Sequence, residues 1–374
     1  MKRLTTRHLA ALAGVAALAG CSGPQAPPSS GGQGAIPVRA GDSECHLDRT
    51  SAPAGTISFD VTNTGSQITE FYLYGPGGRI VAEVENIGPG TQRQLVAQVP
   101  QGGTYQAACK PGMQGNGVRT PFTVTGQAGE ADPAAQAATA DYKRFVTQQA
   151  NDLRSRTREF TDAVKAGDVA RAQALYPRAR EPWERIEPVA ESFEDLDPQI
   201  DGRPDDLEPG QPFTGYHRLE QDLWSRGLQP DSAAVADQLA QQVGEVADRA
   251  PTTELDAAKV ANGAKELLDE VATKKVSGEE DAFSHTDLWD FKANVDGAEQ
   301  VVDSLRPVLQ QKDPKLLSDV DQRFAEVNRE LDRFRVGDGF RSYDQVPPEQ
   351  SKQLAAAVDA VGEPVSRIAG VVAG

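Results

Sequence analysis

A histidine and a glutamate that lie three residues apart offer the clearest chemistry in this sequence. They are His217 and Glu220, in the stretch Gly215–Glu220, and the chain of 374 residues contains only four histidines. If the segment is helical, as we expect, both side chains lie on one face and could bind the same metal ion. A single pair of this kind is weak support for a metal site, so other parts of the chain must supply further ligands.

Two glutamates upstream repeat this spacing. Glu184 and Glu187 also lie three residues apart, and helices that each contribute such a pair can build a metal site inside a bundle. A set of oxygens with one nitrogen suits iron or zinc better than copper(I), which prefers sulfur. The alternative is that both glutamates pair with Arg178, Arg180 and Arg185 on a solvated face, and for Glu187 alone we favour this alternative.

A polar segment farther along, residues 277–287, could reach the same site. Glu280 could contribute a carboxylate from a helix end or a loop. Ser284 or Thr286 is better explained as a helix N-cap. For His285 three interpretations stay open: a ligand, a hydrogen-bond donor to a ligand, or a structural histidine.

The first residues are typical of a targeting signal. A basic start is followed by an apolar run at residues 9–19 that is too short to span a membrane as a stable helix. Leu18–Cys21 then resembles a bacterial lipobox, in which the cysteine is lipidated and becomes the first residue of the mature protein. A plain secretory signal with an incidental cysteine is the alternative. We expect a signal peptide at residues 1–20 and a flexible Pro-, Gly- and Ser-rich tether at residues 21–37.

The charge of the chain excludes one class of partner. The formal net charge is −17, and removal of residues 1–20, which carry three positive and no negative charges, would make it −20. Nucleic-acid binding depends on stripes of lysine and arginine, so we expect no nucleic-acid partner. An acidic protein instead attracts cations.

Two cysteines remain if Cys21 is lipidated. Cys45 and Cys109 could form a disulfide, as an even pair does in an oxidising compartment. Cys109–Met113 is similar to the ligand loop of a cupredoxin, but no histidine lies between these residues, which argues against blue copper. A different metal site could combine both cysteines with Glu70 and Met113. We favour the disulfide, because it needs only one assumption.

Two kinds of periodicity predict two domains. Residues 38–126 contain short alternating runs separated by Gly/Pro turns, which predicts an N-terminal antiparallel β-sandwich. Residues 127–140 are expected to be a linker that leads into a helix. Over residues 141–374 the apolar positions recur with the period of an α-helix, which predicts an all-α helical bundle.

Motifs for catalysis are absent from the sequence. It contains no HExxH, and an inverted zincin would need a histidine where Gln221 follows Glu220. Gly-x-Ser-x-Gly, P-loop and dinucleotide-binding patterns are also missing. We therefore expect a protein that is not an enzyme.

Several motifs together resemble those of the EfeO-type iron-uptake lipoproteins and periplasmic proteins, over nearly the whole mature chain. The resemblance implies a cupredoxin-like β-sandwich followed by an imelysin-like (M75 peptidase-like) helical bundle. The motifs are Glu85–Gly90, Trp183–Glu191, Asp195–Asp197, Ile200–Asp201, Thr214–Glu220 and Phe283–Leu288.

This resemblance also implies a function. Such proteins bind iron outside the membrane and pass it to a permease of the EfeU type, alongside a haem peroxidase of the EfeB type. The implied metal ligands of the helical domain are His217, Glu220, Glu184, Asp201 and Glu280. The resemblance also implies a second site, which could hold copper or zinc, with the ligands Cys45, Glu70, Cys109 and Met113.

We therefore expect an extracytoplasmic iron-binding protein, bound to the bacterial cell membrane through lipidated Cys21. Iron is the expected cargo, as Fe(II) or Fe(III). Two alternatives belong to other classes: a zinc metallopeptidase of the imelysin-like class, and a non-catalytic surface lipoprotein that binds a polymer.

Overall fold

The computed structural model describes residues 34–129, 132–193, 196–204, 207, 210–273 and 275–373. Cys21, the expected signal peptide and most of the expected tether lie outside these residues.

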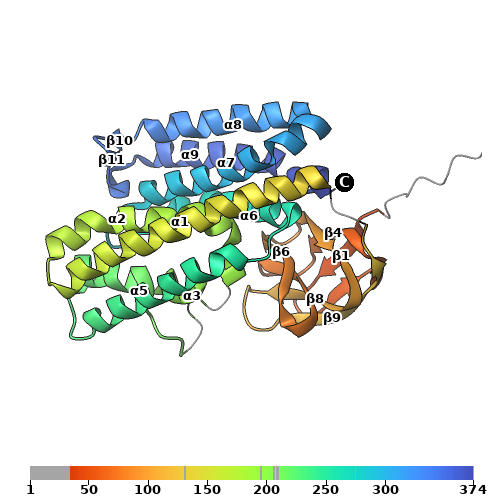
Figure 1. Cartoon of the computed structure of the whole chain (residues 1–374), viewed down its shortest axis with the longest axis horizontal. Helices are drawn as coiled ribbons and strands as arrows, with labels where there is room; N and C mark the ends of the chain where they lie inside the picture. Colours follow the sequence, from red (N-terminus) through yellow and green to blue (C-terminus); the bar gives the residue numbers. More distant parts are fainter. Residues whose placement is uncertain are drawn as a thin grey trace, which may run out of the picture. The chain divides into compact units, whose positions relative to one another are not determined.

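Two β-sheets form the N-terminal part (Figure 1). The first sheet has the order β2-β1-β4-β7, with β1 at Ile36–Ala40, β2 at Cys45–Leu47, β4 at Gly55–Asn63 and β7 at Gln92–Val99. The second has the order β3-β9-β8-β5-β6, with β3 at Ser51–Pro53, β9 at Val118–Gln127, β8 at Gln101–Pro111, β5 at Thr69–Tyr74 and β6 at Ile80–Ile87.

The sheets are mixed rather than wholly antiparallel. β1 pairs in parallel with β4, and β3 pairs in parallel with β9. The chain leaves the first sheet to form β3 in the second and then returns, so that β4 runs in the same direction as β1. Local alternation of side chains predicts that strands are present, but it does not show which strands become neighbours.

The core of the sandwich consists of side chains from both sheets. Phe59 of β4 packs against Phe71 of β5 and Phe122 of β9, with ring centroids 5.2 and 5.4 Å apart. A disulfide between Cys45 of β2 and Cys109 of β8 also joins the two sheets. Of the two alternatives for these cysteines, the structure therefore contains the disulfide.

Helices make up most of the remaining chain. They are α1 (Pro133–Lys165), α2 (Val169–Ile186), α3 (Asp197–Ile200), α4 (Gly215–Gln221), α5 (Ser232–Arg249), α6 (Ala257–Thr273), α7 (Asp287–Lys312), α8 (Pro314–Asp332), α9 (Pro348–Val365) and α10 (Ile368–Ala373). A hairpin of β10 (Arg335–Val336) and β11 (Gly339–Phe340) joins α8 to α9. None of the described helices is both long and apolar enough to cross a bilayer.

The first helix begins inside the segment expected to be a linker. α1 starts at Pro133, where the carboxylate of Asp132 accepts a hydrogen bond from the Ala134 amide. Proline is favoured in the first helical turn because its missing amide would have no partner there. These two residues place the start of the helix ahead of Asp141.

Helix α2 packs against α1 and α7. The end of α2 and the 3-10 turn that follows it, Glu187–Phe193, are contacted closely by two neighbouring helices, which is possible because both present glycine. A Cβ at Gly263 of α6 would lie 1.9 Å from the Pro188 carbonyl oxygen, and one at Gly297 of α7 would lie 2.4 Å from that of Arg185. α6 and α7 thus pack backbone to backbone on the segment around Glu184.

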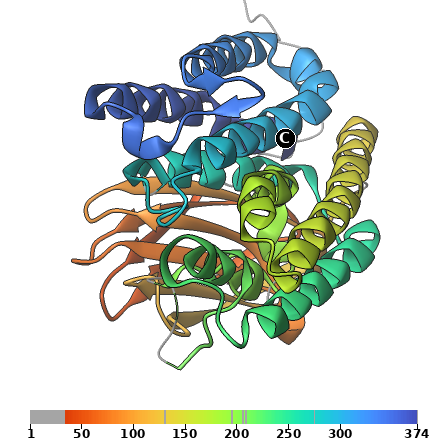
Figure 2. The same cartoon turned by 90° about the vertical axis from the view of Figure 1, so that its left-hand side faces the viewer.

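The strands and helices also contact each other directly. Asn262 of α6 donates a hydrogen bond to the Val96 carbonyl of β7 (2.7 Å), and Arg93 of β7 pairs with Asp269 of α6. The two views agree that α6 lies next to the sandwich, whereas α8 and α9 lie on the side away from the strands (Figures 1 and 2).

Candidate metal centre

Three candidate ligands from separate segments converge inside the helical part. His217 lies in the first turn of α4, Asp201 directly follows α3, and Glu280 lies in the loop before α7. Gly215 makes this possible: its φ is +78°, and a Cβ there would lie 2.1 Å from the Ile200 carbonyl oxygen. Because only glycine fits this close, left-handed position, α4 can begin directly against the residue before Asp201.

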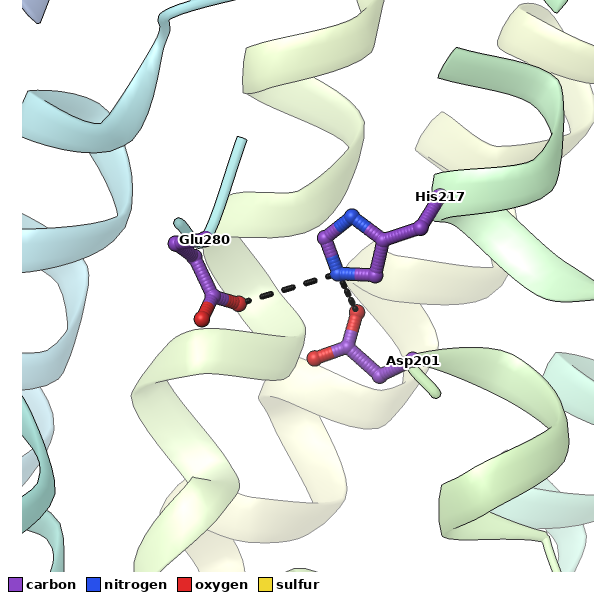
Figure 3. Close-up of side chains that lie close together, drawn as sticks. All are labelled: Asp201, His217 and Glu280. Carbon is purple, nitrogen blue, oxygen red and sulfur yellow. Dashed lines mark ion pairs between the residues drawn. The ribbon is translucent and has the colours of Figure 1, made fainter. Parts of the chain in front are cut away.

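The ligand atoms of these three residues face one another (Figure 3). His217 Nε2 lies 3.5 Å from Asp201 Oδ1 and 3.7 Å from Glu280 Oε1. All three atoms lie within 4.8 Å of one another. The histidine is 1% exposed and the glutamate 3%. One imidazole nitrogen and two carboxylate oxygens in this arrangement fit a hard or borderline cation such as iron or zinc.

Glu220 lies at the other ring nitrogen of His217. Its Oε2 is 3.3 Å from Nδ1, while its Oε1 accepts the amides of Phe283 (3.0 Å) and Ser284 (2.7 Å). In the neutral ring, Nδ1 donates to this carboxylate and Nε2 keeps its lone pair toward Asp201. Glu220 and Asp201 therefore lie at different nitrogens, and an ion bound at Nε2 alone would not contact both.

A further group of potential ligand atoms lies on the Nδ1 side. Asp281 lies within 4.8 Å of both His217 and Glu220 there. Its oxygens accept hydrogen bonds from the hydroxyls of Tyr176 (2.9 Å) and Thr286. The Asp281 carboxylate is therefore hydrogen-bonded by neutral hydroxyl groups, whereas Asp201 and Glu280 accept hydrogen bonds from the charged Arg180.

Glu184 is held by cations and an amide. It accepts hydrogen bonds from Arg180, from Lys275 Nζ (3.0 Å) and from Asn294 Nδ2 (2.9 Å), and it is fully buried. Glu187 accepts two hydrogen bonds from the same lysine, each 2.9 Å long. Of the expected pairing of both glutamates with Arg178, Arg180 and Arg185 on a solvated face, the structure contains the pair of Glu184 with Arg180, but that arginine is buried. Glu187 pairs with the buried Lys275 instead.

Arg180 lies at the centre of the cluster. Its Nη1 contacts Asp201 and lies 3.2 Å from His217 Nε2, and its Nη2 contacts Glu184 and donates to Glu280 Oε1 (2.8 Å). Burial lowers the pKa of this guanidinium, but the surrounding carboxylates raise it further, so it stays charged. This role of Arg180 was not predicted from the sequence. The available signal was an arginine four residues from Tyr176, on the apolar face of its helix.

The pKa of His217 results from opposing effects. Burial and Arg180 lower it, while the hydrogen bond to Glu220 and the charges of Asp201 and Glu280 raise it by more, so that the pKa lies above its ordinary value. A proton and a metal ion would therefore compete for this imidazole as the pH falls.

An acidic cavity of about 550 Å³ adjoins the centre. Both Asp201 and Glu280 line it, and so do residues of β6 and of the loop around Met113. The other carboxylates on its wall are Glu83, Glu85, Glu187, Glu191, Asp197, Glu266 and Glu270; its cations are Arg203, Lys259 and Lys275. Because carboxyl groups outnumber cations on its wall, the cavity provides a polar approach to the centre.

One cavity residue predicts a pH dependence of stability. Burial raises the pKa of Glu83 from 4.5 to about 8, against the lowering by Lys259 and Lys110. The folded protein then binds a proton that the unfolded chain releases, so this stabilisation is complete below pH 4.5 and is lost as the pH rises toward 8. The free energy of unfolding of the unmodified protein should fall between pH 5 and pH 8 as this stabilisation is lost. In Glu83→Gln this fall should be smaller by about 3 kcal/mol, measured by urea unfolding at both pH values.

Glu44→Gln is the matched control, because Glu44 is an exposed glutamate of the same sandwich. This variant should show the same pH dependence of the free energy of unfolding as the unmodified protein. If the free energy of unfolding changed equally with pH in the unmodified protein and in Glu83→Gln, the prediction would be wrong.

The second expected metal site is not assembled in the sandwich. The Cys45 and Cys109 sulfurs are bonded to each other in the core. Glu70 precedes Phe71, the register partner of Cys109, and therefore points to the opposite face of the sheet. There it accepts a hydrogen bond from the Tyr72 hydroxyl (3.0 Å). Met113, with φ +59°, borders the acidic cavity instead.

His285 contributes its backbone rather than a metal ligand. Its amide donates to the Asp281 carbonyl and its carbonyl accepts from Tyr343, both at 2.8 Å. Among the described residues, it belongs to none of the clusters with metal-ligand spacing. Thr286 is the N-cap residue of α7, one of the two positions expected for the cap. Its side chain makes no capping hydrogen bond, however, and donates to Asp281 instead.

The chain matches a known protein family. The family model described as imelysin, peptidase M75, matches residues 138–368. The iron uptake system component EfeO of Yersinia pestis is 38% identical over 345 residues, with 90% of each chain covered. That of Escherichia coli O157:H7 is 37% identical over 342 residues, covering 90% of this chain and 91% of its own.

A solved structure, dithionite-reduced auracyanin from Roseiflexus castenholzii, aligns with 26% of this chain and 100% of its own at 21% identity. Its TM-score of 0.22 is too low to support an argument. The family follows from the sequence relatives: the chain belongs to the imelysin family, in the group of the EfeO proteins.

Proposed function

We propose that this protein binds iron outside the cytoplasmic membrane as a component of an iron uptake system. The observation that carries the proposal is the convergence of Asp201 Oδ1, His217 Nε2 and Glu280 Oε1 within 4.8 Å of one another. The relatives from Yersinia pestis and Escherichia coli, both named iron uptake system component EfeO, support iron as the cargo.

In this proposal each residue has a separate task. Asp201, His217 and Glu280 bind the ion, and iron accepts this set of one nitrogen and two oxygens. Glu220 holds the imidazole by its Nδ1, so that Nε2 points at the ion. The acidic cavity raises the local concentration of cations and gives the ion a polar path to Asp201 and Glu280.

The location of the protein is part of the proposal. Lipidation of Cys21 would hold the chain at the outer face of the membrane, from which iron would pass to a permease like EfeU, alongside a haem peroxidase like EfeB. The Cys45–Cys109 disulfide supports an oxidising, extracytoplasmic compartment.

Binding rather than peptide hydrolysis is the activity that the geometry supports. A catalytic zinc needs an open coordination position for water and substrate, whereas His217 and Glu280 are almost fully buried and Arg180 lies against the metal-facing nitrogen. The purified protein should therefore show no chelator-sensitive proteolysis of unfolded casein. Cleavage that His217→Ala abolishes would favour the metallopeptidase.

Iron binding by the centre is directly testable. We expect His217→Ala to weaken iron binding on the order of 100-fold, about 2.7 kcal/mol, because the only nitrogen ligand is lost. Calorimetric titration of the mature protein with Fe(II) under nitrogen, and with Fe(III) citrate, would measure this. Titrations with zinc and copper would define selectivity.

His46→Ala is the matched control. His46 is an exposed histidine of β2, and its replacement should leave iron affinity unchanged. Unchanged affinity in His217→Ala would overturn the assignment of the centre.

A further inference from the structure

We infer that Arg180 is an internal cation that an arriving metal ion displaces, and that Asp290 receives the displaced guanidinium. The inference rests on the proposed function, because it concerns how the same centre accepts its ion.

The guanidinium contacts the same three atoms that would bind the metal. Nη1 bonds to Asp201 Oδ1 and lies against His217 Nε2, and Nη2 donates to Glu280 Oε1. Those are the atoms whose mutual distances define the centre. A positive guanidinium and a metal cation cannot both occupy contact distance from one set of atoms, so binding of the ion requires Arg180 to move.

A buried carboxylate lies on the opposite side of the guanidinium. Asp290, in the first turn of α7, is 0% exposed, and its Oδ1 lies 3.4 Å from Arg180 Nε. Among the described residues, neither oxygen of Asp290 has a hydrogen-bond partner, and neither does Arg180 Nε. Buried polar atoms without hydrogen bonds are costly, so a shift of the guanidinium toward Asp290 would turn this 3.4 Å ion pair into hydrogen bonds that both groups lack.

The surroundings restrict the direction of this movement. Arg180 is 0% exposed, and its guanidinium carbon lies 5.9 Å from the ring centroid of Tyr176 and 5.7 Å from that of Tyr216. The charged group is thus enclosed in the interior and has aromatic neighbours. Asp281, whose Oδ1 is 3.7 Å from Nε, lies on the same side as Asp290. Arg180 can therefore exchange one set of carboxylates for another without leaving the interior.

Replacing the arginine should strengthen metal binding. In Arg180→Met, the ion no longer competes with an internal cation, and we expect iron to bind at least tenfold more tightly by calorimetric titration. The metal-free variant should melt at a lower temperature, because carboxylates lose their counter-ion, and iron should raise its melting temperature more than that of the unmodified protein. Weaker or equal affinity in Arg180→Met would overturn the inference.

A second variant tests the receiving residue without removing the arginine. Asp290→Asn should weaken iron binding about tenfold in the unmodified background, because displaced Arg180 loses its carboxylate, and should change nothing in the Arg180→Met background. An unchanged affinity in Asp290→Asn alone would also overturn the inference. Arg178→Met is the matched control, since Arg178 is an exposed arginine of the same helix.

The results separate the inference from the proposed function. If the unmodified protein binds no iron, or if His217→Ala binds it equally well, the proposed function fails. If His217→Ala loses iron while both Arg180→Met and Asp290→Asn bind as the unmodified protein does, only the displacement of Arg180 fails.

Discussion

Replacing Lys275 with methionine is expected to lower the free energy of unfolding by about 3–5 kcal/mol, because loss of one partner leaves buried charges uncompensated. Lys275 is 1% exposed, and its Nζ pairs with Glu184 at 3.0 Å and Glu187 at 2.9 Å. Burial lowers the pKa of this lysine, but the surrounding glutamates raise it well above its ordinary value, so the lysine is charged in the folded protein. Methionine fills a similar volume, which isolates the effect of the charge.

Urea unfolding followed by circular dichroism would measure this effect. Lys352→Met, at an exposed position of α9, is the control and should change stability by less than about 0.5 kcal/mol. Adding Glu187→Gln to Lys275→Met should restore part of the loss, because one unpaired carboxylate is removed. A loss below about 1 kcal/mol in Lys275→Met would show that the glutamates find other partners or protons.

Removal of the disulfide should have an effect of similar size, confined to the sandwich. Cys45 and Cys109 are separated by 64 residues. Opening a loop of this length increases the entropy of the unfolded chain, and we expect Cys45→Ala with Cys109→Ala to cost about 4 kcal/mol. Because the bond joins the two sheets, the unfolding midpoint of the sandwich should fall.

A reducing agent supplies the control for this prediction. Dithiothreitol should lower the melting temperature of the unmodified protein but not that of the double alanine variant. The prediction is wrong if the double variant has the same melting temperature as the unmodified protein. It is also wrong if titration of free thiols finds Cys45 and Cys109 unbonded.

The order of strands followed by helices could be predicted from the sequence, because side-chain periodicity is a local property. The parallel pairing of β1 with β4 could not, since it depends on where the chain changes sheets. Helix boundaries depended on single residues: the start of α1 at Pro133 follows from the cap at Asp132, inside a stretch whose alanine-rich composition suggested a linker.

The candidate site could be predicted only in part. His217 was identifiable from its spacing to Glu220, but the spacing could not show that the two share a hydrogen bond at Nδ1 while Asp201 faces Nε2. The buried cations were missed for a physical reason. An arginine or lysine is usually found at the protein surface. Burial of Arg180 is possible because several carboxylates compensate for the loss of water around its charge.

The network around Glu184 has a consequence for the time course of folding. Arg180 and Glu280 are 100 residues apart in the chain, and Glu184 and Asn294 are 110 apart. Contacts between such distant residues require closure of long loops and form slowly. We expect the centre to be among the last parts of the chain to assemble, so that the proposed iron ion would meet a finished bundle rather than guide its folding.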